Sequence, residues 1–269
     1  AVAQAIARQL AARAAPLATL IAETGGLNAM LVDSSALPEQ VVRDVIQSAF
    51  LSAGQRCSSL RVLFLQHEIA TPVLSMLRGA MHELRLGDPG LIATDIGPLI
   101  DADAKTHLLA HISRMRDTAR LIAETPLPAE QAERGHFLAP IAFEIDAMAQ
   151  IGGEHFGPVL HVIRYAADEL DAVIEQINAS GYGLTLGVQS RIESTWRHVQ
   201  ARARVGNCYV NRGITGAVVG TQPFGGEGWS GTGPKAGGPH YLLRFVTERC
   251  LSVNTAAVGG NLALLVAPD

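Results

Sequence analysis

Apolar positions along the chain recur with two different spacings, and these spacings predict alternating helices and strands. Apolar residues at every third or fourth position indicate an amphipathic helix, whereas a short apolar run indicates a buried strand. Helices are expected over residues 2–13, 38–52, 67–85, 103–124, 168–179 and 192–204. Strands are expected over residues 18–22, 28–32, 60–66, 137–143, 159–165, 183–189, 206–211 and 242–253.

This order of elements predicts an α/β fold with three layers, αβα. Strands that alternate with helices in this way form crossover units, which give a mostly parallel sheet. No repeat or linker interrupts the pattern, so we expect one main domain over residues 21–255. Residues 1–20 are expected to be the remnant of a neighbouring domain of a longer polypeptide, because the chain begins inside a helical pattern. Residues 256–269 form an apolar tail of unknown role.

A long glycine-rich stretch, residues 212–241, has no apolar period. A loop of this length inside a compact domain is usually functional. It contains G-E-G-W-S-G at residues 226–231, which has the spacing of a dinucleotide fingerprint. That fingerprint requires a preceding strand and a following helix, and neither is expected here. We therefore do not interpret this motif as a nucleotide site.

Composition and charge narrow the function classes. The 269 residues are 48% apolar and 17% charged, so the chain can bury a substantial core. The formal net charge of −4 gives no basic surface for nucleic acid. The three cysteines form no C-x-x-C pair and favour a reducing, cytoplasmic setting. No histidine or cysteine motif predicts a metal site.

One cysteine and one glutamate stand where chemistry is possible. Cys57 lies on a turn between an expected helix and an expected strand, just after Gly54. Glu23 ends the 18–22 run, which would place its carboxylate at the carboxyl end of a strand, where α/β sheets bind ligands. A thiolate with a carboxylate that accepts a proton from water is sufficient for acyl-enzyme chemistry. The alternatives are a small buried cysteine and a surface carboxylate. The other cysteines, Cys208 and Cys250, are expected to be structural.

Four motifs occur in one order along the chain. They are E-T-G-G at Glu23, G-Q-R-C at Cys57, E-H-F-G-P-V at Glu154 and P-F-G-G-x-x-x-S-G-x-G around Phe224. Together they resemble the aldehyde dehydrogenase superfamily. The stretches C-S-S after residue 56, T-G-A-V-V-G at 215–220 and S-G-T-G-P-K-A-G-G-P-H-Y at 230–241 are most similar to L-glutamate γ-semialdehyde (1-pyrroline-5-carboxylate) dehydrogenases. This group includes the dehydrogenase half of the bifunctional bacterial proline utilisation A family.

The resemblance implies roles for the residues that match these motifs. Cys57 matches the nucleophile, whose backbone N–H also contributes to the oxyanion hole, and Glu23 matches the general base that activates water. Glu154 matches the residue that binds the nicotinamide ribose of NAD. Phe156 matches the residue that packs near the nicotinamide ring.

The same resemblance implies a substrate. It is L-glutamate γ-semialdehyde, oxidised to L-glutamate in proline catabolism. Ser58, Gly216 and Ala217 match the anchor for its carboxylate, which consists of one hydroxyl and two backbone N–H groups. Phe224 matches an aromatic wall against its methylene stem.

The chain also departs from the family pattern. The motifs expected for the nucleotide-binding domain, for the oxyanion-hole asparagine, for a second aromatic wall and for the dimer hairpin are missing from these residues. Residues 1–20 would then be the remnant of the NAD-binding domain, and residues 21–255 the aldehyde dehydrogenase catalytic domain. The expected parent is a homo-oligomer, in which FAD would belong only to a possible upstream proline dehydrogenase domain. The parent protein is expected to be the NAD-dependent enzyme, and the isolated chain is expected to be inactive. Two alternatives stay open: a dehydrogenase for another aldehyde, and a catalytically inert fragment.

Overall fold

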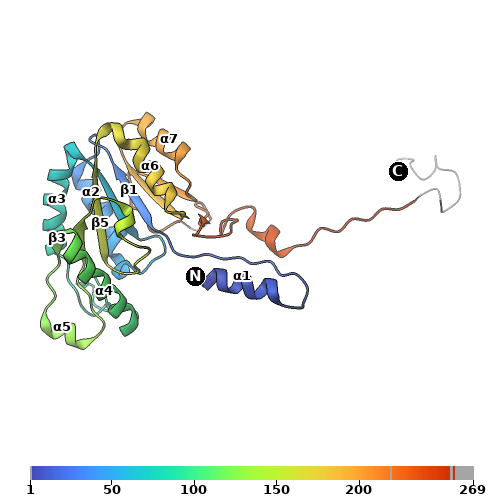
Figure 1. The fold of residues 1–269 in the computed structure, drawn as a ribbon, viewed down its shortest axis with the longest axis horizontal. Helices are drawn as coiled ribbons and strands as arrows, with labels where there is room; N and C mark the ends of the chain where they lie inside the picture. Colours follow the sequence, from blue (N-terminus) through green and yellow to red (C-terminus); the bar gives the residue numbers. More distant parts are fainter. Residues whose placement is uncertain (1, 219, 255–256, 258–269) are drawn as a thin grey trace.

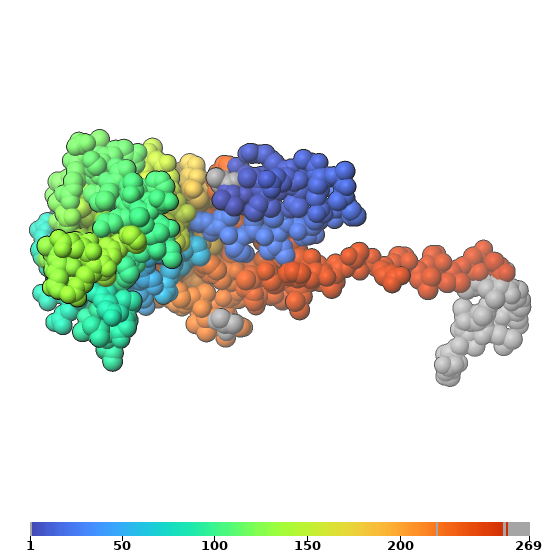
Figure 2. All heavy atoms as spheres, turned by 90° about the horizontal axis from the view of Figure 1, so that it is seen from below, coloured from blue at the N-terminus to red at the C-terminus, as the bar shows by residue number. Residues whose placement is uncertain are grey.

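The computed structural model describes residues 2–218, 220–254 and 257. Figure 1 shows one twisted sheet with helices packed on both sides. At the other end of the molecule, the chain after the last helical turn runs out as an extended segment, which Figure 2 shows leaving the body of the protein. The predicted tail, residues 256–269, lies outside the described residues apart from Ala257.

The central sheet has seven strands in the order β3-β4-β5-β2-β1-β7-β8. Every neighbouring pair is parallel except β3 and β4. The strands are β1 (Asn28–Val32), β2 (Leu60–Gln66), β3 (Arg120–Glu124), β4 (Ile141–Glu144), β5 (Val159–Tyr165), β7 (Thr185–Gln189) and β8 (Asn207–Val210). This arrangement confirms the predicted α/β fold with a mostly parallel sheet.

Helices cover both faces because the crossovers run in two directions across the sheet. The connection from β1 to β2 carries α2 (Pro38–Phe50), and the next helix is α3 (His67–His82). The connections from β5 to β7 and from β7 to β8 run the other way and carry α6 (Leu170–Ala179) and α7 (Glu193–Arg202). Right-handed crossovers in opposite directions place their helices on opposite faces, as Figure 1 shows.

The core lies between these layers. All seven residues of β2 are buried, as expected for a central parallel strand covered on both faces. Val41, Val45 and Phe50 form the inner face of α2 and have no exposed surface. The remaining helices are α1 (Val2–Ala12), α4 (Ala102–Thr118) and α5 (Ala129–Arg134). α1 buries none of its side chains.

The predicted helix over residues 103–124 is wrong in its second part. α4 ends at Thr118, Ala119 is extended, and Arg120–Glu124 forms β3. The strand pairs antiparallel with β4, so a tertiary contact overrides a local pattern that fits either structure. The strand predicted over 137–143 begins later, at Ile141.

Two other predicted strands are absent from the described residues. Residues 18–22 are extended but unpaired as a strand, and Glu23 alone forms a bridge, to Gly231. Residues 242–253 form the end of a 3-10 turn (Tyr241–Phe245) and then an exposed extended segment. The glycine-rich loop contributes one short strand, β9 (Glu227–Gly228), which pairs with β6 (Tyr182–Gly183).

Candidate active site

The turn that carries Cys57 has an unusual backbone. Ser52, Ala53 and Gly54 follow α2 and all have left-handed φ angles, of 56°, 53° and 64°. A Cβ atom on Gly54 would lie 2.3 Å from the carbonyl oxygen of Gly157, so glycine is required there. The reversal leaves Cys57 half-buried, just before the start of β2.

Asn28 holds this turn in place. Its Nδ2 donates to the Cys57 carbonyl oxygen at 2.7 Å and to the Ser59 carbonyl oxygen at 2.9 Å. Its Oδ1 accepts from the Thr185 N–H at 3.1 Å, so one buried amide links β1, β2 and β7. No local motif marks Asn28. The only hint in the sequence is a single amide at the start of an apolar strand, separated from a pair of glycines by Leu27.

The structure brings Glu23 and Cys57 together although they are distant in sequence. Residues on either side of Glu23 pair with the glycine-rich loop: Thr232 N–H donates to the Ala22 carbonyl oxygen, and Thr24 N–H donates to the Ser230 carbonyl oxygen. Glu23 and Cys57 line one cavity of about 370 Å³. The other residues that line it are Thr24, Gly25, Glu154, Phe156, Phe224 and Ala236.

Burial sets the protonation of this pair. It raises the pKa of Glu23, and the nearby Lys235 opposes that shift. Burial also raises the pKa of the Cys57 thiol; the N–H groups of Ser58 and Cys57 oppose the shift, whereas the carboxylates of Glu154 and Glu23 add to it. In the unliganded protein these shifts favour the protonated thiol of Cys57 and increase the proton affinity of the Glu23 carboxylate.

Glu154 lies against a glycine cradle. The Gly26 N–H donates to its Oε1 at 3.0 Å, and a Cβ on Gly25 would lie 1.6 Å from its Oε2. Arg61 approaches the same carboxylate at 3.9 Å. Burial raises the pKa of Glu154, and the Gly26 hydrogen bond and Arg61 oppose the shift.

Arg61 is a second residue that the sequence analysis missed. It is 1% exposed and donates to the carbonyl oxygens of Gly157 at 2.9 Å and Arg56 at 3.2 Å. Its guanidinium lies 5.3 Å from the centre of the Phe156 ring, and burial lowers its pKa to about 10. A single cation within the apolar run of residues 60–66 was the pattern that pointed to it.

A second and larger cavity also opens at Cys57 and shares Phe156, Phe224 and Ala236 with the first. Its volume is about 700 Å³. Its wall includes Cys57, Ser58, Ala217 and Phe224, which the sequence analysis assigned to nucleophile and substrate. Gly216 is exposed, with φ of 77°, and does not line this cavity, although its neighbour Ala217 does.

The predicted place of the site within the sheet is wrong. Glu23 precedes β1, Cys57 precedes β2 and Glu154 precedes β5, so these residues gather at the amino ends of the parallel strands. The prediction rested on a strand over residues 18–22, which does not form. The loop that carries Gly216 and Ala217, the candidate substrate residues, instead begins at the carboxyl end of β8.

A third cavity, of about 660 Å³, connects the site to α1. It is lined by residues of α1 together with Leu20, Tyr182 and Trp229, and it shares Thr24, Gly25 and Glu154 with the cavity at Cys57. Among the described residues, no group of three or more histidine, cysteine, aspartate or glutamate side chains has an arrangement suited to a metal ion. The described helices are all too short or too polar to cross a bilayer.

Comparison with known proteins identifies the family to which the chain is similar. Residues 1–250 match the model of the aldehyde dehydrogenase family. The chain is 59% identical over 234 residues to the bifunctional protein PutA of Klebsiella aerogenes, covering 86% of this chain and 18% of the relative. It is 37% identical over 238 residues to 1-pyrroline-5-carboxylate dehydrogenase of Geobacillus kaustophilus, covering 88% of this chain and 45% of the relative.

A comparison with solved structures finds the same kind of relative. A Bradyrhizobium japonicum proline utilization A (PutA) variant superposes with a TM-score of 0.91 at 54% identity, over 96% of this chain and 26% of that one. The chain thus spans about a fifth of the length of the curated PutA relatives that it matches.

Proposed function

Because the chain belongs to the aldehyde dehydrogenase family, we propose that it carries the catalytic residues of an NAD-dependent L-glutamate γ-semialdehyde dehydrogenase. The observation that supports this most directly is the shared cavity of Cys57 and Glu23. The identity to proteins named PutA and 1-pyrroline-5-carboxylate dehydrogenase supports the substrate and the role in proline catabolism.

The proposed chemistry uses Cys57 twice. Its Sγ gives its proton to water and attacks the aldehyde carbon, which gives a thiohemiacetal whose oxyanion the Cys57 N–H stabilises. NAD, when bound, would accept the hydride from this carbon and leave a thioester on Sγ. Glu23 then accepts a proton from water, the hydroxide adds to the thioester carbon, and the C–S bond breaks. L-glutamate leaves, and the departing thiolate takes the proton from Glu23, which restores the Cys57 thiol.

The residues present fit the nicotinamide end of the cofactor. Glu154 offers a carboxylate that occupies the space left by the missing side chain of Gly25 and accepts from the Gly26 N–H, at the wall of the Cys57 cavity. Carboxylate oxygens suit the two donor hydroxyls of a ribose. Phe156, which is 44% exposed, offers a ring face on the same side. We propose that these two residues hold the nicotinamide nucleoside.

The larger cavity fits the substrate. Its wall is mostly apolar, which suits the methylene stem beside Phe224. We propose that the Ser58 hydroxyl and the N–H groups of Gly216 and Ala217 bind the carboxylate of the substrate. Small residues at 216 and 217 allow the backbone to approach an anion closely.

The catalytic assignment is tested in the full-length protein. Cys57→Ala should abolish semialdehyde-dependent NADH formation, and Glu23→Gln should allow a single turnover and then accumulate the thioester, detected as added mass on Cys57. Cys208→Ala, in β8 and away from the cavities, is the control and should keep its activity. Unchanged turnover in Cys57→Ala would overturn the assignment.

Two further candidate functions can be distinguished from the proposed one by measurement. A dehydrogenase for another aldehyde would show a higher kcat/KM with an uncharged aldehyde than with the semialdehyde. An inert isolated chain would show no heat of NAD binding in calorimetry, whereas the full-length protein would bind. We propose that the full-length protein is bifunctional, as the names of its PutA relatives suggest. The family resemblance alone suggests that it is a homo-oligomer and that FAD belongs to a separate proline dehydrogenase domain.

A further inference from the structure

A polar stripe runs along the buried side of α2. Gln40, Asp44 and Ser48 are spaced by four residues and therefore lie on one face of the helix, one above another. Asp44 is 2% exposed and Ser48 is 0% exposed. Buried polar groups are costly unless they are hydrogen-bonded, so their partners are informative.

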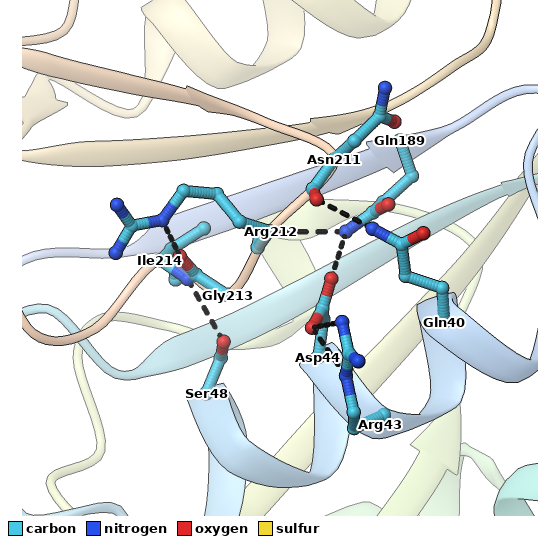
Figure 3. A network of polar contacts seen from close by, with 9 residues as sticks. All are labelled: Gln40, Arg43, Asp44, Ser48, Gln189, Asn211, Arg212, Gly213 and Ile214. Carbon is cyan, nitrogen blue, oxygen red and sulfur yellow. Dashed lines mark hydrogen bonds and ion pairs between the residues drawn. The ribbon is translucent and has the colours of Figure 1, made fainter.

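All three side chains bond to one segment, residues 211–214, directly or through one amide (Figure 3). Gln40 Nε2 donates to the Asn211 carbonyl oxygen at 2.6 Å. The Ile214 N–H donates to Ser48 Oγ at 3.0 Å.

Gln189 supplies the link between these two contacts. Its Nε2 donates to Asp44 Oδ2 at 2.9 Å and reaches the Arg212 carbonyl oxygen at 3.5 Å. The other Asp44 oxygen accepts from Arg43 at 3.2 Å. The segment therefore has a hydrogen-bonded contact at its beginning, middle and end.

The contacts follow the same order along the two backbones. The helix rises about 12 Å from Gln40 to Ser48, at about 1.5 Å per residue. The segment from Asn211 to Ile214 is bent, with φ of 53° at Asn211, and it meets Gln40 first and Ser48 last. Because a crossover helix runs opposite to its strands, the segment travels with α2 from the carboxyl end of the sheet towards the amino end, where Cys57 lies.

The end of the segment is fixed most firmly. Ile214 is fully buried, and its Cγ2 would lie 2.8 Å from a Cβ on Gly187, so the side chain fills the space above that glycine. Two residues later the chain reaches Gly216, whose carbonyl oxygen accepts from Arg212 at 3.3 Å. The loop with the proposed carboxylate anchor is thus fastened to the same helix that leads into the Cys57 turn.

We propose that the stripe of Gln40, Asp44 and Ser48, acting with Gln189, positions the anchor loop relative to Cys57 and so sets the preference of the site for aldehydes that bear a carboxylate. The four residues are positioning residues, because none lines the cavities at Cys57. The inference rests on the proposed function, since it concerns the residues Gly216 and Ala217 that we assign to the substrate.

The test compares two aldehydes in the full-length protein. Ser48→Ala removes the acceptor of a fully buried N–H, so the loop should shift, and kcat/KM for L-glutamate γ-semialdehyde should fall about tenfold through a higher KM. For butanal, which has no carboxylate, kcat/KM should change by less than about twofold, because Cys57 keeps its own supports. Gln40→Ala should give a smaller change in the same direction, since Gln40 is partly exposed.

A second readout does not depend on turnover. Hydrogen exchange of the peptide that contains Ile214 should speed up in Ser48→Ala while exchange in β2 stays slow. Thr125→Val is the matched control, because it removes another buried hydroxyl, bonded to the Met81 carbonyl oxygen beside the opposite edge of the sheet. Thr125→Val should lower the stability of the protein without changing the ratio of the kcat/KM values for the two aldehydes.

The outcomes separate the two proposals. A wild-type protein that does not oxidise the semialdehyde overturns the proposed function itself. The positioning role is overturned if the wild-type protein oxidises the semialdehyde but kcat/KM falls equally for both aldehydes in Ser48→Ala and Gln40→Ala. If Ser48→Ala does not fold, the substrate ratio and the loop exchange of Gln40→Ala decide alone, and wild-type values of both overturn the inference.

Discussion

At the scale of single residues, the environment of Cys57 favours the neutral thiol. Burial and two nearby carboxylates raise its pKa, and the N–H groups around it compensate only in part. Thiols react as thiolates, so the reactivity of Cys57 in the unliganded protein depends on pH.

Alkylation measures this dependence. We expect iodoacetamide to label Cys57 slowly at neutral pH and faster as the pH rises, with a midpoint above that of an ordinary cysteine. Glu23→Gln removes a charge that raises the pKa, so its labelling curve should move to lower pH. Mass spectrometry of the Cys57 peptide gives the rates, with exposed Cys250 as the internal reference. Rapid labelling of Cys57 at every pH would contradict the expectation.

A second residue-scale prediction concerns the turn before the cysteine. Gly54→Ala places a side chain at a φ of 64°, which costs about 1–2 kcal/mol, and directs it at the Gly157 carbonyl oxygen. We expect a lower Tm and a lower kcat in the full-length protein. Gly79→Ala is the matched control: the Gly79 side of α3 is open, so alanine should be neutral or stabilising by up to about 1 kcal/mol. Equal losses of Tm and kcat in Gly54→Ala and Gly79→Ala would contradict the requirement for glycine at position 54.

The sequence identifies some of these residues and not others, for a physical reason. Cys57, Glu23, Glu154 and Phe156 stand in local motifs, and the structure brings them together. Asn28, Arg61 and Ser48 act through partners that are distant in sequence, so no local pattern states their role. Only their polarity inside apolar elements marks them.

At the scale of elements, three histidines join α4 and β5 to the loop that carries Glu154. The rings of His111 and His155 stack with centroids 3.5 Å apart, and His111 Nε2 lies 2.9 Å from His161 Nε2. His161 Nδ1 lies 3.1 Å from the Arg61 carbonyl oxygen, which can only accept, so this nitrogen carries the proton. His111 must then donate to His161 from Nε2 and accept from Arg114 at Nδ1. All the hydrogen bonds are satisfied when both rings are neutral.

Acid should break this arrangement. Burial lowers the pKa of His161 to about 4 and that of His111 to about 2, from 6.5, and His155 and Arg114 reinforce both shifts. The hydrogen bond to the Arg61 carbonyl oxygen opposes the shift of His161. The unfolded chain binds protons more readily than the folded one below pH 6.5, so stability is full above that value and is lost as the pH falls towards 4. For His161 alone the loss is about 3 kcal/mol.

Urea unfolding between pH 4.5 and 7.5 measures this loss. His161→Gln removes one titrating ring and should flatten the curve of unfolding free energy against pH. His107→Gln is the control, because His107 is exposed on α4 and lies outside the histidine stack, and it should leave the slope unchanged. Identical slopes in wild type and His161→Gln would exclude the histidine stack as the acid-sensitive element.

Element boundaries show where local patterns fail. β1, β2 and β5 were predicted with their observed bounds, because buried central strands are continuous apolar runs. β3 was read as the end of a helix, since Leu121 and Ile122 fit the apolar period of the preceding turns. Only its antiparallel pairing with β4, at the edge of the sheet, decides the outcome.

At the scale of the whole molecule, the chain divides into a packed body and a loosely attached end. The segment that was predicted as a last strand is exposed, with Leu251 at 87% and Val253 at 62%. Its apolar composition explains the prediction, but no strand of the described sheet pairs with it.

Truncation tests this division. A chain that ends at Val246 should keep the Tm of the parent chain, because the described side chains it loses are exposed. A chain that ends at Ser230 also loses Thr232, whose backbone and hydroxyl bond to Ala22, and it should unfold at a lower temperature. Differential scanning calorimetry compares the two; a large loss of Tm in the first truncation would show that the exposed segment stabilises the body.

The direction of α2 has a final consequence for Cys57, the proposed nucleophile. The helix ends at Phe50, at the amino edge of the sheet, so it presents its carbonyl end, the negative pole of its dipole, to the side of the molecule where Cys57 lies. Many reactive cysteines instead sit at the positive, amino end of a helix, which stabilises a thiolate. Peroxide attacks thiolates in preference to thiols. The orientation of this helix therefore acts in the same direction as burial and the nearby carboxylates, which favour the thiol form of Cys57, and we expect peroxide to oxidise Cys57 slowly in the unliganded protein.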